Sequence, residues 1–477
     1  MRAITTMLSD SEKEVIHRTS LSVLEKTGVD VGSEKVAEML KQKGANVVGT
    51  KVRFPKEMVE EYLKLVKTDF KMAARNDEHS FTVPSVEFPH VTTAGYMSLV
   101  TDLGATKPRA ATTEDLSKYS ILCDAIDEFG FYWPIVMPTD CPDAFMEYNA
   151  LETAYKYNSK HIQASCCTGQ MAVWQVELAK TLAGGAENLK KNPTFSVLAA
   201  TFSPLAMEGG AAEANVYAAQ NGVPVAPMSL SLMGSTSPVT FAGNTVLTNA
   251  EELMCYMMVK CANEDAAFIY TADSGAPNMS NLAYNYNNPE YLLTGAADAD
   301  MARYYGMPNF VVSGTGEWKD FSSYCGFERN IYKAAMAYMT RTDLSCSFGS
   351  LDNCLSSSFA EVMLDTEAYR LAKAYLRSYE INEDKLAAEV IDQIGPHGNF
   401  LECEHTFRHF KEEVSTYNRD VQKSFVFDAT SDKDYREVAQ EQAEKIWATH
   451  EVPAIAEDLQ KEMEILRSKA YKDLVGE

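Results

Sequence analysis

Six aromatic side chains lie in or just beyond apolar segments that read as buried strands and the helices after them. They are Trp133, Tyr270, Trp318, Tyr324, Phe327 and Phe348. Tyr96, in a segment expected to supply a further strand, is a seventh candidate. The face of an aromatic ring attracts a cation, so several rings around one cavity would suit a quaternary ammonium. Each ring could equally fill the core, and we expect only some of them to face a ligand.

Polar residues also stand where the expected strands end. Asp140 follows one strand, Asp273 follows another, and Cys166-Cys167 close a third. No serine or cysteine lies in a nucleophile-elbow motif. Buried thiols are usually inert, so we interpret Cys166 and Cys167 as core residues and expect no side-chain nucleophile.

A metal site has one sequence signal. His405 and His409 are four residues apart on an expected helix, a spacing that places two imidazoles on one face. The sequence shows no glutamate of the zincin type between them and no evident third ligand. We therefore predict no metal site.

The elements around these residues alternate between strand and helix. Strands are expected at 131–137, 162–167, 195–201, 223–230, 267–271, 309–313 and 344–348, with an eighth within 91–100. Thr113 with Glu114 and Asp115 has the composition of a helix start, because hydroxyls cap and acids favour the positive end. Strands separated by helix-length segments indicate a parallel sheet. A doubly wound sheet fits the pattern too, but no glycine-rich phosphate turn follows the first strand. We predict an α/β fold, a (β/α)8 TIM barrel whose chemistry lies at the C-terminal ends of the strands.

The barrel is expected to carry additions at both ends. Residues 1–90 read as an N-terminal helical cap with a hairpin, 91–380 as the TIM-barrel catalytic domain, and 381–477 as a C-terminal helical extension.

Four long segments resemble the trimethylamine methyltransferase superfamily. They are GATKPRAATTEDL with the strand ending PTD (104–140), 200–254, SGAPNMSNLAYNYNNPEYL (274–292) and GPHGNFLECEHTFRHF (395–410). The resemblance implies a barrel enzyme that passes a methyl group from an amine to the Co(I) centre of a corrinoid protein. The family's loop commonly has Gly and Pro where this chain has Leu282 and Tyr284, a difference that bears on the substrate.

In the founding members of that superfamily, one segment carries the encoded residue pyrrolysine. Aligning Phe327-Glu328 with the family's aromatic-Glu pair places ordinary Tyr324 at the pyrrolysine position. The resemblance therefore points to the non-pyrrolysine branch, whose substrates are quaternary amines such as glycine betaine and proline betaine. Tyr324 is the expected catalytic residue. Tyr96, Trp133, Asp140, Tyr270, Trp318, Phe327, Phe348 and His397 are the expected substrate-binding residues.

A betaine also carries a carboxylate, and an unpaired buried charge is costly. His397, between Gly395 and Gly398, is one candidate partner for it. Arg329 and backbone N–H groups at Gly314 and Gly349 are alternatives.

The remaining expectations concern partners and location. The chain has no DxHxxG motif for cobalamin, so the resemblance implies that cob(I)alamin arrives on a separate corrinoid protein. The formal net charge of -24 argues against nucleic acid and anionic membranes as partners. The 477 residues include no apolar run of membrane-spanning length, no signal peptide and no CxxC pair among ten cysteines, which favours the cytoplasm. A homo-oligomer is left open.

Two other classes of protein fit the same sequence. One is a non-catalytic betaine-binding or sensor protein built on the same barrel. The other is a metal-dependent TIM-barrel lyase or aldolase.

Overall fold

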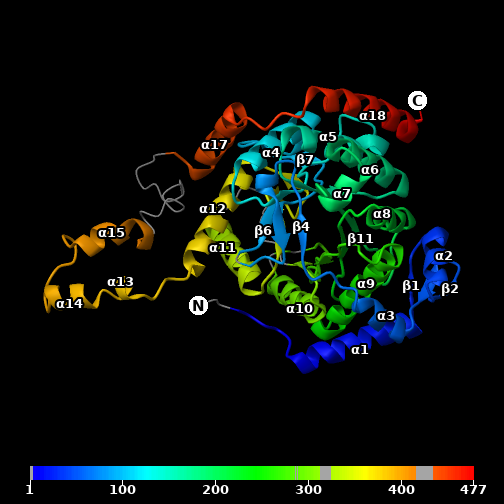
Figure 1. Cartoon of the computed structure of the whole chain (residues 1–477), viewed down its shortest axis with the longest axis horizontal. Helices are drawn as coiled ribbons and strands as arrows, with labels where there is room; N and C mark the ends of the chain where they lie inside the picture. Colours follow the sequence, from blue (N-terminus) through cyan, green and yellow to red (C-terminus); the bar gives the residue numbers. More distant parts are fainter. Residues whose placement is uncertain are drawn as a thin grey trace.

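The computed structural model describes residues 4–86, 88–284, 286, 288–311, 324–414 and 433–476, and at positions 324, 325, 327 and 328 it describes the backbone alone. Helices wrap around a central sheet, with the first helices on one flank and the last on the opposite edge (Figure 1). None of the described helices is both long and apolar enough to cross a membrane.

The N-terminal segment forms three helices, a small sheet and a hairpin. Its elements are α1 (Asp10–Lys26), β1 (Val29–Asp30), α2 (Glu34–Gln42), β2 (Asn46–Val48), β3 (Lys51–Arg53), α3 (Lys56–Leu63), β4 (Phe70–Met72), η1 (Asp77–His79) and β5 (Phe81–Val83). Ser9 begins α1 with a capping box, in which its side chain accepts from the Glu12 N–H and Glu12 accepts from the Ser9 N–H. The antiparallel pairing of β4 with β5 confirms the predicted hairpin.

The central region alternates strands and helices as the sequence predicts. Its elements are β6 (His90–Thr93), β7 (Leu99–Val100), β8 (Arg109–Ala110), α4 (Thr113–Ala125), β9 (Phe131–Tyr132), η2 (Asp143–Phe145), α5 (Met146–Tyr157), β10 (His161–Ser165), α6 (Gly169–Ala183), α7 (Ala186–Lys191), β11 (Phe195–Ala200), α8 (Gly209–Gln220), β12 (Val225–Ser229), α9 (Phe241–Ala262), β13 (Tyr270–Ala272), α10 (Pro289–Tyr305), β14 (Asn309–Phe310), α11 (Tyr324–Met339), β15 (Leu344–Phe348), β16 (Ser350–Leu351), β17 (Ser356–Ser357) and α12 (Phe359–Leu376). The cap of α4 is Thr112, one residue before the predicted Thr113.

Six strands form one parallel sheet in the order β14-β13-β12-β11-β10-β9, and β15 pairs in parallel with β6 in a separate ladder. The parallel α/β architecture is confirmed. The closed eight-stranded barrel is not shown: the described residues form a curled sheet of six strands and a pair.

Side chains supply part of the hydrogen bonding at the two seams between the sheet and the pair. Between β6 and β9, the Trp133 N–H donates to the Thr92 hydroxyl at 2.8 Å, and the Thr93 hydroxyl donates to the Trp133 carbonyl. Between β14 and β15, Asp343 accepts from the N–H and the side-chain amide of Asn309, both at 2.9 Å. Backbone bonds also cross the first seam, from the Gly130 N–H to the Val91 carbonyl at 3.1 Å and from the Tyr96 N–H to the Pro134 carbonyl at 3.0 Å. The described residues nevertheless form no continuous strand ladder at either seam.

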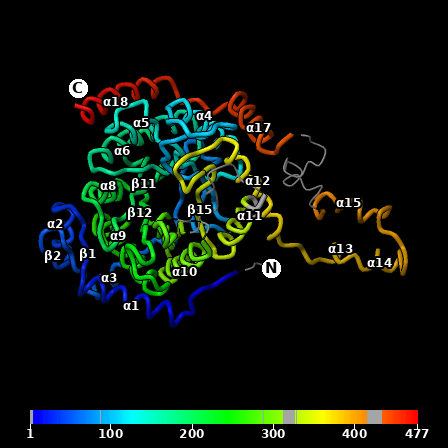
Figure 2. Tube along the Cα trace, turned by 180° about the vertical axis from the view of Figure 1, so that it is seen from behind, coloured from blue at the N-terminus to red at the C-terminus, as the bar shows by residue number. Residues whose placement is uncertain are grey.

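The C-terminal region has two parts that differ in how they contact the rest. The helices α13 (Glu383–Leu386), α14 (Ala388–Ile394) and α15 (Glu404–Glu413) extend away from the central sheet (Figures 1 and 2). By contrast, α17 (Tyr435–Thr449) packs against α12 and α4, and α18 (Glu457–Val475) packs against α6, on the outside of the helices that surround the sheet. Trp447 packs edge-on against Phe359 with ring centroids 4.6 Å apart, and Trp174 donates to Asp473 at 2.8 Å.

Candidate active site

The concave side of the sheet is lined by alternate residues of each strand, because side chains on a strand alternate between faces. Its buried apolar members are Phe131, Trp133, Leu198, Ala226, Met228, Ala267, Ile269, Phe310, Leu344 and Cys346. The hairpin contributes Phe70, Met72 and Val83 to the same cluster, and Phe81 stacks on His90 at the start of β6. The hairpin thus covers the N-terminal end of the strands, which leaves their C-terminal end for chemistry.

Trp133 lies on this concave side with only 8% of its surface exposed. Its ring is edge-on to Tyr96 at 5.9 Å and to Phe310 at 6.1 Å between centroids. A Cβ added at Gly95 would lie 2.0 Å from the indole, so only glycine allows this approach. The indole N–H has no acceptor among the residues that the structure describes. A buried donor without an acceptor is costly, so this N–H is a candidate contact for a ligand.

Tyr96 connects this ring cluster to β10. Its backbone is left-handed (φ 64), and its hydroxyl accepts a hydrogen bond from the Ser165 N–H at the end of β10. Burial raises the pKa of the Tyr96 hydroxyl well above its ordinary value. Tyr96, Trp133 and Phe310 therefore form a rigid aromatic group, of which the sequence analysis identified the first two.

Asp273 stands at the C-terminal end of β13, two residues beyond Thr271 on the same face. The Tyr286 hydroxyl donates to its carboxylate at 3.0 Å, and the Tyr284 hydroxyl donates to its backbone carbonyl at 3.0 Å. The two rings lie 4.2 Å apart, and Tyr286 lies 5.2 Å from Tyr291. Burial raises the pKa of Asp273 to about 6, against the opposing effect of the tyrosine hydroxyls. Burial raises the pKa of the Cys346 thiol on β15, and the negative charge of Asp273 adds to that effect.

The three tyrosines around Asp273 lie in the segment 274–292, which resembles the family. Tyr286 and Tyr291 were not predicted as site residues, and Tyr284 was named only as a departure from the family's loop. A useful signal was the density of tyrosines directly after a strand that ends in an aspartate.

Two adjacent glutamates of α9 bind the ends of the strands from the helix side. Glu251 accepts hydrogen bonds from Thr201, Ser203 and Ser229 hydroxyls at 2.7–2.8 Å and from a backbone N–H at 2.8 Å. Glu252 accepts from the N–H groups of Ser229 and Thr271, and burial raises its pKa. Both side chains are fully buried. They fix the C-terminal ends of β11, β12 and β13, on which the candidate site is built.

Two predicted site residues face away from the concave side. Tyr270 alternates with Ile269, so it points toward the helices, where its hydroxyl donates to Asn249 of α9 at 3.3 Å. Phe348 has the parity of Leu344 and Cys346 but lies beyond a register shift in the pairing of β15 with β6. Ser347 within that shift has φ 85, and Phe348 packs on Phe129 and on Tyr369 of α12 instead. The structure therefore does not bring these two rings together with Trp133.

Two more predicted residues have other surroundings. Asp140 is exposed and accepts from the Thr113 N–H and hydroxyl at 2.8–3.1 Å, so it holds the start of α4. His397 lies between α14 and α15 in the part that extends away from the sheet, and it is exposed. The alternative carboxylate partner at Gly349 already donates its N–H to Asp365 at 2.8 Å.

The remaining predicted residues either lie outside the described part of the chain or have only their backbone described. Trp318 and Gly314 lie outside the described residues, as do the side chains of Tyr324 and Phe327. The backbone of Tyr324 begins α11, the helix that follows β14 and precedes β15.

The chain belongs to the family described as trimethylamine methyltransferase (MTTB), whose model matches residues 2–470. It is similar to a trimethylamine methyltransferase of Desulfitobacterium hafniense (strain DSM 10664 / DCB-2), with 26% identity over 96% of this chain and 95% of that protein. A glycine betaine methyltransferase of Desulfitobacterium hafniense (strain Y51) is 25% identical over 99% of this chain and 98% of its own length. The family resemblance drawn from the sequence is thereby confirmed.

The fold is similar to a solved structure as well. The monomethylamine methyltransferase of Methanosarcina barkeri superposes with a TM-score of 0.52 at 10% sequence identity, over 93% of this chain and 89% of that one. At this identity the likeness concerns the fold alone.

Proposed function

We propose that this chain is a methyltransferase that moves a methyl group from a quaternary amine of the betaine class to the Co(I) centre of a corrinoid protein. Family membership supports methyl transfer, and the similarity to a protein named glycine betaine methyltransferase supports the substrate class. The observation that carries the choice of a cationic amine is Asp273 among tyrosine rings at the end of β13. A carboxylate and aromatic faces are the groups that hold a quaternary ammonium.

The reaction requires no proton transfer to or from the protein's side chains. The corrinoid partner supplies the electron pair that bonds to the methyl carbon as the C–N bond breaks. The electrons of that bond stay on nitrogen, and a neutral tertiary amine leaves without any proton transfer. The residues at the C-terminal ends of the strands therefore serve to orient the N–CH3 bond and exclude water, and orientation can account for a large part of the rate.

The charges at the site suggest how a betaine would lie. Asp273 would attract the ammonium and repel the substrate carboxylate, so the carboxylate is expected to point away from β13. Ammonium charge falls in the transition state, so a stronger grip on the cation would not raise the rate. The indole N–H of Trp133 is a donor available to the carboxylate, since no acceptor binds it in the described chain.

Methyl transfer can be measured directly. The purified chain is mixed with cob(I)alamin and either glycine betaine, proline betaine or trimethylamine, and the cobalt spectrum is followed. We expect a betaine to give methylcobalamin. A reaction with trimethylamine alone would overturn the substrate class. Tight binding of a betaine with no transfer to any corrinoid would instead favour the binding or sensor protein.

A further inference from the structure

The part of the chain between α12 and α17 has no core of its own in the described residues. None of the helices α13, α14 and α15, which we call the arm helices, contains a buried residue. Large apolar side chains on and before them are open to solvent, including Ile381 at 74%, Leu401 at 78% and Phe407 at 76% exposed. A short segment that buries little apolar surface needs another source of stability, such as a disulfide or a metal ion.

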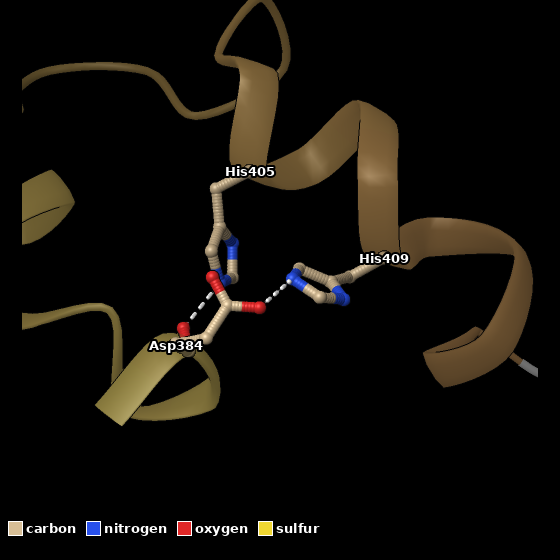
Figure 3. Close-up of side chains that lie close together, drawn as sticks. All are labelled: Asp384, His405 and His409. Atoms are coloured by element: carbon tan, nitrogen blue, oxygen red, sulfur yellow. Dashed lines mark hydrogen bonds and ion pairs between the residues drawn. The ribbon is translucent and has the colours of Figure 1, made fainter. Parts of the chain in front are cut away.

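Within the arm helices, one group of side chains converges (Figure 3). Asp384 of α13 meets His405 and His409 of α15, and each offers one ligand atom within 4.8 Å of the others. The carboxylate of Asp384 lies between the two imidazoles in Figure 3. His409 Nε2 is 2.9 Å from Asp384 Oδ2, and His405 Nε2 is 3.0 Å from the Asp384 backbone carbonyl. The rings are 4.5 Å apart.

The ring nitrogens of His409 show that this group is more than an ion pair. Only 13% of the His409 side chain is exposed, and its Nε2 faces the Asp384 carboxylate at 2.9 Å. Its Nδ1 is buried and has no hydrogen-bond partner among the described residues, which is costly unless something else binds the ring. A cation bound between the imidazoles and the carboxylate would be such a partner.

The donor set selects the kind of cation. Two imidazole nitrogens and one carboxylate oxygen are ligands that suit Zn²⁺, whereas Mg²⁺ and Ca²⁺ prefer oxygen. Tetrahedral bonds of about 2.0–2.2 Å place two ligand atoms of one ion roughly 3.4 Å apart. The ligand atoms of this group, which lie within 4.8 Å of one another, would therefore move closer together when an ion binds. Arg408 pairs with Asp384 Oδ1 at 3.1 Å and leaves Oδ2 for the ion.

We propose that Asp384, His405 and His409 bind a divalent cation of the zinc class that fastens α13 to α15. Asp384 comes from α13, the first of the arm helices, and His405 and His409 come from α15, the last of them. One ion would therefore link the two ends of this part of the chain. The role is structural, because the group lies on the extension that Figure 1 shows standing away from the central sheet. The proposal does not depend on the proposed methyl transfer.

Metal retention tests the site on the full-length chain. The protein is stripped with a chelator, loaded with Zn²⁺, desalted and analysed for zinc per chain. We expect close to one zinc in the unaltered chain and a loss of affinity of at least about tenfold in Asp384→Asn, since even the outer-shell partners of metal sites contribute roughly 10–100-fold. His397→Ala removes an imidazole from the same extension outside the group, and it should retain zinc. Equal retention by a His405→Ala/His409→Ala double variant and by His397→Ala would overturn the proposal.

A second measurement covers the case in which a variant disturbs the arm helices. The stripped unaltered chain is titrated with Co²⁺, and visible absorption is recorded together with limited proteolysis between residues 377 and 414. Bound Co²⁺ should give d–d bands and slow the cleavage, and both effects should disappear in Asp384→Asn. Cleavage that Zn²⁺ and Co²⁺ leave unchanged, with no d–d bands, would also overturn the site.

Discussion

The central sheet and the arm helices differ in the interactions that stabilise them. In the sheet, apolar strands are buried on both faces, and buried carboxylates such as Glu251 and Asp343 complete the hydrogen bonding at strand ends. In the arm helices, charged pairs such as Lys385–Glu413 lie at the surface and apolar side chains face solvent. Exposed ion pairs contribute little to stability, whereas a buried hydrogen-bonded carboxylate is costly to remove. The comparison indicates that the side chains held by buried hydrogen bonds are concentrated at the strand ends, where the candidate site lies.

The strongest test of this contrast removes Glu251. Glu251→Ala leaves three hydroxyls and one N–H without their acceptor, so we expect the free energy of unfolding to fall by about 3 kcal/mol or more. Chemical denaturation measures it. Glu251→Gln keeps the shape and should cost less. A loss below about 1 kcal/mol in Glu251→Ala would show that the strand ends do not depend on this carboxylate.

Tyr324 tests whether α11 contributes a wall of the site. Tyr324→Ala should lower methyl transfer by on the order of 100-fold with little change in melting temperature, because small misplacements of the reacting bond are costly. Tyr324→Phe, which keeps the ring, should stay near the unaltered rate. The opposite pattern, a destabilised chain with normal kinetics, would assign Tyr324 to packing.

Asp273 makes a prediction about pH. Its pKa of about 6 means that the carboxylate is charged above that pH and becomes neutral as the pH falls through it. The affinity for glycine betaine should therefore be highest above pH 6 and decline below it. Asp273→Asn should weaken binding at pH 7.5 by about tenfold, or ~1.4 kcal/mol, and flatten the profile between pH 5 and 7. Calorimetric titration measures both, and an unchanged profile in the variant would remove Asp273 from the site.

The smallest effect is expected in the arm helices. Lys385→Ala breaks pairs with Glu412 and Glu413 at 3.5 and 2.6 Å. We expect a change below about 1 kcal/mol in unfolding free energy, since such pairs are screened and flexible. A loss as large as that of Glu251→Ala would end the distinction between the two regions.

The sequence by itself determined the order of the elements and the family. Strand β15 falls at the predicted residues, 344–348, and the central strands appear where apolar runs predict them, because local burial patterns identify a parallel sheet. The long motifs identified the trimethylamine methyltransferase family, which the match over residues 2–470 confirms.

Only the tertiary structure decided which side chains meet. Strand parity directs Tyr270 to the helices, and a register shift at Ser347 turns Phe348 the same way, although both looked like site residues. At the seams of the sheet, Thr92 and Asp343 bond to the backbone of the neighbouring strand, and no local sequence pattern predicts those side-chain bonds. Asp384 stands 21 residues before His405, so the third candidate ligand for a metal became visible only when α13 and α15 were placed together. Contacts between distant residues depend on how the elements pack, and a local sequence pattern does not contain that information.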